Sequence, residues 1–145
     1  MHDETENMEP VPILQRVKMM TAINETEGFT FISKKNVLVN QDNYTKYGRY
    51  SVGNYQDNFF KVPFTNNHEL KSALNAGLNK INEYFNTINE LLLPQFPSFG
   101  AWVQDGCLVI DPVSIYDDLF SASKMGEFKN QFAIWDFKTM KEIPL

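Results

Sequence analysis

The order of elements expected between residues 59 and 137 constrains the fold more than any other feature of this sequence. The residue pattern predicts a strand, a long helix, a hairpin, a second helix and a last strand, at 59–64, 67–92, 99–110, from Ser114, and at 131–137. This βαββαβ (ferredoxin-like) order gives an antiparallel sheet, and right-handed crossovers place both helices on one face. We therefore expect an α+β protein whose other sheet face is open to a partner.

The long helix is the clearest of these elements. Apolar residues recur at steps of three and four, as on the buried face of an amphipathic helix: Leu70, Leu74, Leu78, Ile81, Phe85, Ile88 and Leu92. Asn66 or Asn67 can cap its start, and Pro94 and Pro97 follow its end. Gly77 lies in its middle and predicts a bend or close packing.

Turn residues mark the boundaries of the remaining C-terminal elements. The Asp105-Gly106 pair between two apolar runs is typical of a tight β-hairpin. Pro112 is expected to interrupt the strand ladder. Ser114 is expected to cap the next helix. Its inner face would consist of Ile115, Leu119 and Ala122, and Asn130 is expected to end it in a left-handed conformation.

The N-terminal part divides into a tail and the start of the domain. Residues 1–12 are polar and acidic without apolar periodicity, which predicts a disordered tail before a single domain at 13–145. Residues 13–22 have a short helical pattern. Two apolar runs at 29–33 and 37–39 predict an extra N-terminal β-hairpin, which would extend the sheet at one edge.

Charge and composition narrow the classes of function. The formal net charge is −5, whereas nucleic-acid binding needs clustered Lys and Arg, so we expect no nucleic-acid partner. The apolar runs are too short to span a bilayer, and residues 1–12 lack the pattern of a signal peptide. The single cysteine, Cys107, excludes an internal disulfide and fits a reducing compartment. We therefore expect a cytoplasmic protein without a membrane partner.

A tyrosine-rich segment at 41–58 is the best candidate for partner binding. Tyrosine gives a large amphipathic contact area at low entropy cost, and Asn and Gly adapt around it. The alternative is a connection whose tyrosines cover the protein's own sheet. Tryptophans on the expected strands are further candidates for partner binding if they lie on the open face of the sheet. Large aromatic residues are enriched in interface hot spots. The candidate residues are Tyr44, Tyr47, Arg49, Tyr50, Tyr55, Trp102 and Trp135.

One acidic arrangement suggests catalysis. Asp111 and Asp136, together with Lys138, could hold Mg²⁺ and activate water as in a metal-dependent nuclease. Turns and helix caps are the stronger explanation of these carboxylates. His2 and His68 are the only histidines, and there is no glycine-rich phosphate loop. We therefore expect no catalytic residue, no metal and no cofactor.

Several short motifs mark the chain from Gly100 onward: Ala101-Trp102-Val103, Asp105-Gly106, Ile110-Asp111 and Asn130-Gln131-Phe132-Ala133-Ile134-Trp135-Asp136. With these motifs the C-terminal part resembles a group of small uncharacterised proteins of bacteriophages and mobile genetic elements. Gly28-Phe29-Thr30-Phe31 matches an early strand of that group. The resemblance implies a genomic context, and with it the host cell cytoplasm, rather than an activity.

The expected function is that of a small phage or mobile-element accessory protein that acts by binding a protein. An inhibitor of a host defence system is one such role. The alternatives are a virion or assembly component that forms a homo-oligomer through the helix from Asn67 to Leu92, the metal-dependent nuclease, and a small-ligand regulatory domain.

Overall fold

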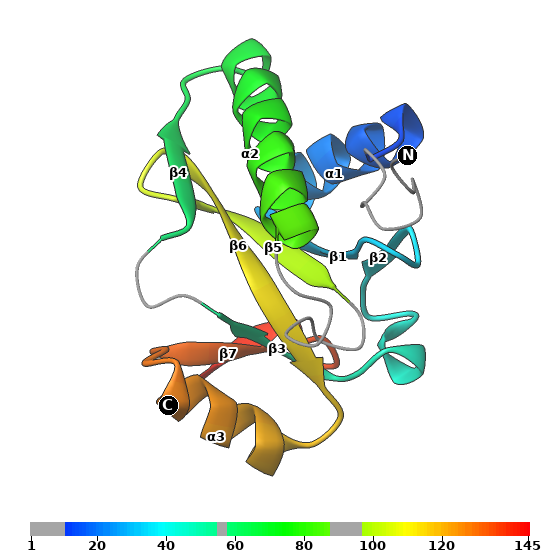
Figure 1. Cartoon of the computed structure of the whole chain (residues 1–145), viewed down its shortest axis with the longest axis vertical. Helices are drawn as coiled ribbons and strands as arrows, with labels where there is room; N and C mark the ends of the chain where they lie inside the picture. Colours follow the sequence, from blue (N-terminus) through cyan, green and yellow to red (C-terminus); the bar gives the residue numbers. More distant parts are fainter. Residues whose placement is uncertain (1–10, 55–57, 88–96) are drawn as a thin grey trace.

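The computed structural model describes residues 11–54, 58–87 and 97–145, which form an α+β fold with helices packed on a curled antiparallel sheet (Figure 1). The helices are α1 (Ile13–Thr26), the 3-10 helix η2 (Tyr44–Lys46), α2 (Asn67–Thr87) and α3 (Leu119–Phe128). The strands are β1 (Gly28–Ile32), β2 (Val37–Val39), β3 (Tyr50–Gly53), β4 (Phe60–Pro63), β5 (Ser98–Gln104), β6 (Cys107–Tyr116), β7 (Ala133–Asp136) and β8 (Lys141–Pro144). Most of the expected acidic tail, residues 1–10, lies outside the described residues.

The long strand β6 organises the sheet. The described strands follow the order β2-β1-β5-β6-β3-β7-β8, all antiparallel. One edge of β6 pairs with β5, and the other pairs first with β4 and then with β3. The antiparallel α+β class is therefore confirmed. The expected ferredoxin-like order is not confirmed, because the last predicted strand, β7, pairs with β3 and not with β4.

Both predicted hairpins are present. The N-terminal hairpin is β1 paired with β2, and β1 joins the sheet at the free edge of β5. In the second hairpin, Asp105 and Gly106 have φ of 51° and 73°. Positive φ at both central residues is what a tight type I′ turn requires. Strand β8, which the sequence analysis did not predict, forms a third hairpin with β7.

The start of α3 corrects two expectations. Pro112 does not interrupt the ladder but lies within β6 opposite Phe99, and Ser114 lies in the same strand opposite Val52. The helix begins at Leu119 instead, where the Asp118 carboxylate accepts a hydrogen bond of 2.8 Å from the Ser121 N–H. The strand continues because β3 offers partners for residues 113–116. Pairing between distant segments thus outweighed a local capping signal.

The helix ends follow the local signals more closely. The Asn66 side chain caps α2 by accepting a 2.9 Å hydrogen bond from the Glu69 N–H, and Glu69 accepts bonds from the N–H and hydroxyl of Thr65. Asn130, just beyond α3, has a φ of 56°, as the predicted left-handed end requires. The structure describes α2 to Thr87, so the predicted end of the helix at residues 88–92 lies outside the described residues.

Two apolar clusters attach the helices to the sheet. The larger one joins α1 and α2 to β1, β5 and β6, with Phe31 and Phe99 in ring contact at 5.5 Å. A smaller one joins α3 to β3 and β7 around Val52 and Ile134. On β6, Ile110 faces α2 and Tyr116 packs near α3. These two residues are an even number of positions apart on the strand. Because side chains alternate along a strand, α2 and α3 cover the same face, near opposite ends of β6 (Figure 1).

Replacing Gly77 by Ala should lower the free energy of unfolding by about 1 kcal/mol, although Ala is the better helix former. A Cβ atom at Gly77 would lie 2.2 Å from the Ile110 Cδ1 atom and 3.1 Å from the Phe60 ring, so α2 approaches the sheet closely here, as expected. The exposed neighbour variant Asn79→Ala should be neutral or slightly stabilising. Urea unfolding of both variants checks this, and a Gly77→Ala protein more stable than the wild type would contradict it.

Candidate interaction surface

The tyrosine-rich segment packs on the sheet face that the helices leave uncovered. Tyr44 and Tyr47 are half-buried against a third cluster that includes Ile32, Val39 and Phe137. The 3-10 helix η2 carries Tyr44 to this position, and Asn43 fixes the turn before it by donating a 2.9 Å hydrogen bond to the Leu38 carbonyl. These tyrosines therefore cover part of the sheet and remain partly exposed to solvent. Their role in partner binding stays a prediction.

Of the other two candidate tyrosines, Tyr50 is buried and Tyr55 lies outside the described residues. Tyr50 is buried in β3, with 6% of its surface exposed, between α3 and the sheet. It is therefore not available as a surface contact of the folded chain, which corrects its place among the candidates. The reason is the register of β3, which turns this ring inward opposite Tyr116. Tyr55 lies outside the described residues.

Arg49 forms a two-pronged ion pair with Asp136. Its Nε and Nη2 atoms each lie 2.9 Å from a different carboxylate oxygen, and its guanidinium stacks 5.0 Å from the Tyr50 ring centre. Asp136 is buried and also accepts bonds from the Lys138 N–H and the Thr139 hydroxyl. Hydrogen bonds from Arg49 lower the pKa of Asp136 to about 2. The pair therefore orders the turn between β7 and β8.

The two tryptophans lie on the face opposite α2. Trp102 of β5 is half-buried opposite Val109, and its indole N–H donates a 3.3 Å hydrogen bond to Gln104. Trp135 of β7 is half-buried against the same cluster as Tyr44 and Tyr47. Each ring thus covers sheet surface and keeps an exposed part, so the predicted role of both in partner binding remains open to experiment.

Asp111 is a buried carboxyl group whose ionised form is disfavoured by loss of water. It lies on β6 with 4% of its surface exposed, on the face opposite α2, and accepts a 2.8 Å hydrogen bond from the Phe59 N–H. Burial raises its pKa to about 6, because the ionised carboxylate loses water there. The hydrogen bond from Phe59 opposes that rise. A substantial share of the Asp111 side chains is therefore protonated near pH 6.

The structure does not bring the nuclease candidates together. Asp136 lies opposite Tyr50, which lies opposite Tyr116, and Asp111 is five positions further along β6, roughly 16 Å at the rise of a strand. Alternation also turns Asp111 to the other face from Tyr116. The Asp136 oxygens accept bonds from Arg49 and neighbouring turn residues. Within the described ranges no group of three or more His, Cys, Asp or Glu could hold a metal ion.

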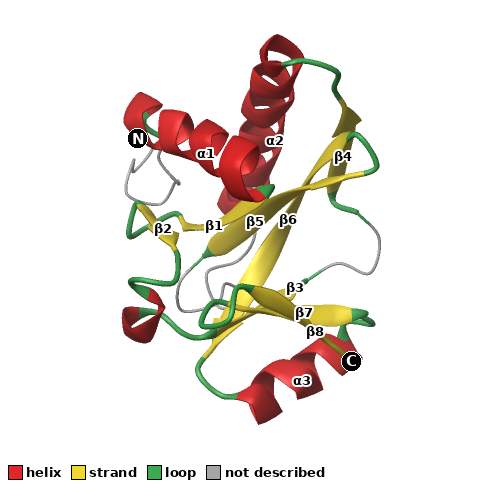
Figure 2. Cartoon of the chain, turned by 180° about the vertical axis from the view of Figure 1, so that it is seen from behind, coloured by secondary structure: helices red, strands yellow, loops and turns green. Residues whose placement is uncertain are grey.

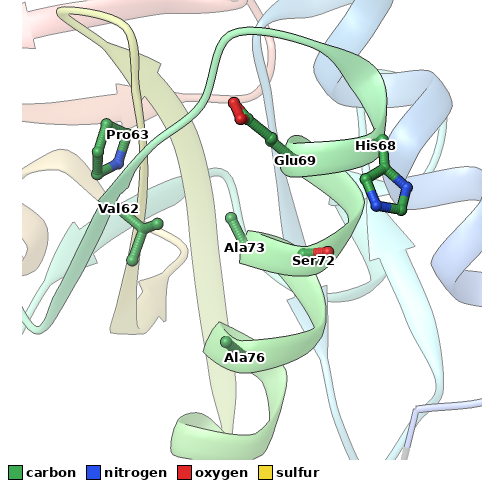
Figure 3. A pocket seen from close by; sticks show the side chains of 7 residues that line it. All are labelled: Val62, Pro63, His68, Glu69, Ser72, Ala73 and Ala76. Carbon is green, nitrogen blue, oxygen red and sulfur yellow. The ribbon is translucent and has the colours of Figure 1, made fainter.

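A shallow groove of about 450 Å³ lies between β4 and the first turns of α2 (Figure 3). Val62 and Pro63 line one side, and small side chains of α2 line the other. Figure 3 shows His68 turned away from β4. Glu69 is engaged by Thr65, whose hydrogen bonds lower the carboxyl pKa. His68 and Ser72 of α2 also line the groove, one helical turn apart. Among the described residues no hydrogen bond joins these two side chains.

Three exposed phenylalanines lie on and just after α3, and the sequence analysis missed them. Phe120, Phe128 and Phe132, here called the phenylalanine face, are 72%, 77% and 92% exposed. Phe120 and Phe128 are two helical turns apart on the side of α3 away from Ala122 and Gly126, which are buried. Side chains of this size bury on the order of 150–250 Å² each in protein contacts. Together the three rings of the phenylalanine face therefore expose a large amount of apolar area.

The phenylalanine face was not predicted because the sequence analysis started the helix at Ser114, whereas α3 begins at Leu119. A helix started at Ser114 would place Leu119 and Ala122 on the inner side, but Leu119 is 44% exposed as the first residue of α3. The usable signal was the spacing of Ala122 and Gly126, which lets the helix approach the sheet and turns Phe120 and Phe128 outward. Ile13, Leu14 and Val17 of α1 are exposed as well.

The fold and these surfaces define the class: an α+β protein in which α2 and α3 cover one face of a curled antiparallel sheet and the tyrosine-rich segment packs on the other (Figure 2). Comparisons with family models, with curated proteins and with solved structures found no match to this chain. Among the described helices, none combines the length and apolar character needed to cross a membrane.

Proposed function

We propose that this protein acts by binding another protein rather than by catalysis. The single observation that carries the proposal is the phenylalanine face, Phe120, Phe128 and Phe132. Phe120 and Phe128 lie on the same side of α3, and exposed apolar area gathered on one side of a protein often marks an interaction site. Phe rings also contribute strongly to interface energetics. The half-buried Tyr44, Tyr47, Trp102 and Trp135 are a second, weaker candidate contact region on another part of the surface.

The combined variant Phe120→Ser and Phe128→Ser should lose its partners without losing its fold. We expect at least about tenfold less of the partner to be retained, because removal of a central aromatic anchor commonly costs 2 kcal/mol or more. The measurement is quantitative mass spectrometry of bacterial lysate proteins held by the immobilised full chain, compared with wild type.

Two control variants separate the surfaces in this experiment. Ile13→Ser removes an equally exposed apolar side chain from α1, and Tyr47→Ala reports on the tyrosine-rich segment. Both should retain the partner of the phenylalanine face. Equal recovery by wild type and the double variant would remove the support for this binding surface.

The biological setting belongs to the same proposal. We place the protein among phage or mobile-element accessory proteins, with inhibition of a host defence system as the role, on the resemblance of its C-terminal motifs. A homo-oligomer through α2 is less favoured. The exposed positions of the described part of α2 are mostly polar: Asn67, His68, Lys71, Ser72, Ala76, Asn79, Lys80, Glu83, Asn86 and Thr87.

A finer description of the sheet is also proposed. We suggest that β3 and β4 together take the place of the first strand of a ferredoxin-like sheet. What supports this is that both pair antiparallel with the same edge of β6, β4 at residues 107–110 and β3 at 113–116. Counted as one interrupted strand, they give the order β7, β3/β4, β6, β5, which is that of a βαββαβ sheet. The β1–β2 hairpin and β8 would then extend its two edges.

A further inference from the structure

The charges on the phenylalanine face indicate the chemistry of its partner. The Lys124 ammonium lies 5.6 Å from the centre of the Phe120 ring, and the Lys129 ammonium lies 5.8 Å from that of Phe128. Within the part of the chain that the structure describes, neither lysine forms an ion pair. Lys124 lies midway between Phe120 and Phe128 along the helix. The apolar face therefore has at its centre a positive charge that forms no ion pair, although Glu127 lies three positions further along the helix.

We infer that the phenylalanine face binds a protein segment that places a carboxylate opposite Lys124, between two apolar sites that receive Phe120 and Phe128. The two rings are roughly 12 Å apart along the helix axis, which sets the spacing of those sites. A carboxylate there pairs with an ammonium that the Phe120 ring already orients, and desolvation at the centre of an interface strengthens that attraction. The inference rests on the proposed protein-binding function and adds the kind of partner.

A second copy of this chain fits the face poorly. A symmetric pair needs a two-fold axis, and opposing Phe120 with the Phe128 of another copy puts Lys124 on that axis. Lys124 of one copy would then face Lys124 of the other within an apolar contact. Like charges brought together there cost free energy.

An anionic lipid surface is also a poorer match than a protein. Asp117, Asp118 and Glu127 are exposed close to the face, and the whole chain carries a net charge of −5. Attraction to anionic lipid comes from clusters of Lys and Arg, each worth about 1 kcal/mol, and acidic neighbours oppose it. A protein can instead set a single carboxylate against Lys124.

Selection from a random peptide library on the immobilised full chain tests the inference. Enriched peptides should carry Asp or Glu between large apolar residues. Fluorescence anisotropy of a selected peptide should show affinity at least about tenfold weaker for Phe128→Ser, and about three- to tenfold weaker for Lys124→Glu. Changing the acidic residue of the peptide to Lys should restore its affinity for Lys124→Glu. All these positions are exposed, so circular dichroism should show an unchanged fold for both variants.

The possible results separate the inference from the proposed function. Binding that depends on Phe128 but not on Lys124, or enrichment of peptides without acidic residues, overturns the acidic partner and leaves the protein-binding surface in place. No enrichment, or binding insensitive to Phe128→Ser, overturns both. Sedimentation of wild type as a dimer that Phe128→Ser dissociates, or co-sedimentation with phosphatidylglycerol vesicles that Phe128→Ser abolishes, would replace the peptide-like partner by a second copy or a membrane.

Discussion

Replacing Asp136 by Asn should lower the free energy of unfolding by about 2 to 3 kcal/mol at pH 7. The carboxylate is buried and accepts hydrogen bonds from Arg49, from the Lys138 N–H and from the Thr139 hydroxyl. Asn has almost the same shape, but its amide group brings donors to a site that already consists of donors. The guanidinium of Arg49 also loses its charged partner. Urea unfolding at pH 7 measures the loss.

The pH dependence of the same variant gives a second check. Because Arg49 and its neighbours lower the pKa of Asp136 from 3.8 to about 2, the folded protein holds the proton less tightly than the unfolded chain. The stabilisation is therefore complete above about pH 4 and is lost as the pH falls through about 2. The difference between wild type and Asp136→Asn should shrink over that range. The exposed control Asp42→Asn should change stability little, and an equal effect of both variants would contradict the role of the pair.

Replacing Asp111 by Asn should have the opposite effect and raise stability by about 2 to 3 kcal/mol at pH 8. Burial raises the pKa of this carboxyl from 3.8 to about 6, so the folded protein must hold a costly charge above that pH. Asn keeps an oxygen that can accept the hydrogen bond from the Phe59 N–H without carrying the charge. Denaturant unfolding at pH 8 measures the gain.

The sign of the pH effect distinguishes Asp111 from Asp136. With a raised pKa, the folded protein binds a proton more tightly than the unfolded chain, so wild-type stability rises as the pH falls from above 6 towards 4. The advantage of Asp111→Asn should therefore shrink over that interval and be small at pH 4. If Asp111→Asn instead destabilised the protein at pH 8, the ionised carboxylate would have to be a stabilising group.

Features with a local cause could be predicted from the sequence. The Asp105-Gly106 hairpin depends on residues that accept positive φ, and the α2 start depends on the Asn66 side chain three residues from its hydrogen-bond partner. The buried stripe of α2 follows helical periodicity, and Gly77 marks its close approach to Ile110. Each of these needs only neighbours within a few positions, so a single sequence contains the signal.

Features that depend on distant pairing could not be predicted in this way. Pro112 and Ser114 were expected to end a strand and cap a helix, yet β6 continues to Tyr116 because β3 pairs with it. The strand β8 is short and polar, and it is held by β7 and by the turn that Asp136 orders. A strand such as β8, which is stabilised mainly by its partners, need not have a periodic pattern from which it could be predicted.

The candidate binding surface shows the same division. The tyrosine-rich segment was recognised from composition, but only the register of β3 turns Tyr50 into the core and leaves Tyr44 and Tyr47 half-buried. The phenylalanine face could be recognised only from the structure, because the actual start of α3 at Leu119 places Phe120 and Phe128 on the side away from the sheet.

Local chemistry in this chain was thus enough to predict its turns, its long helix and its α+β class. Tertiary structure decided which ionisable groups are paired or buried and which aromatic rings remain uncovered. Arg49 and Asp136 are 87 positions apart, and Phe59 and Asp111 are 52 apart. The physical reason is that burial and charge pairing act between surfaces that meet only when the sheet closes, whereas caps, turns and periodicity act within one turn or one strand.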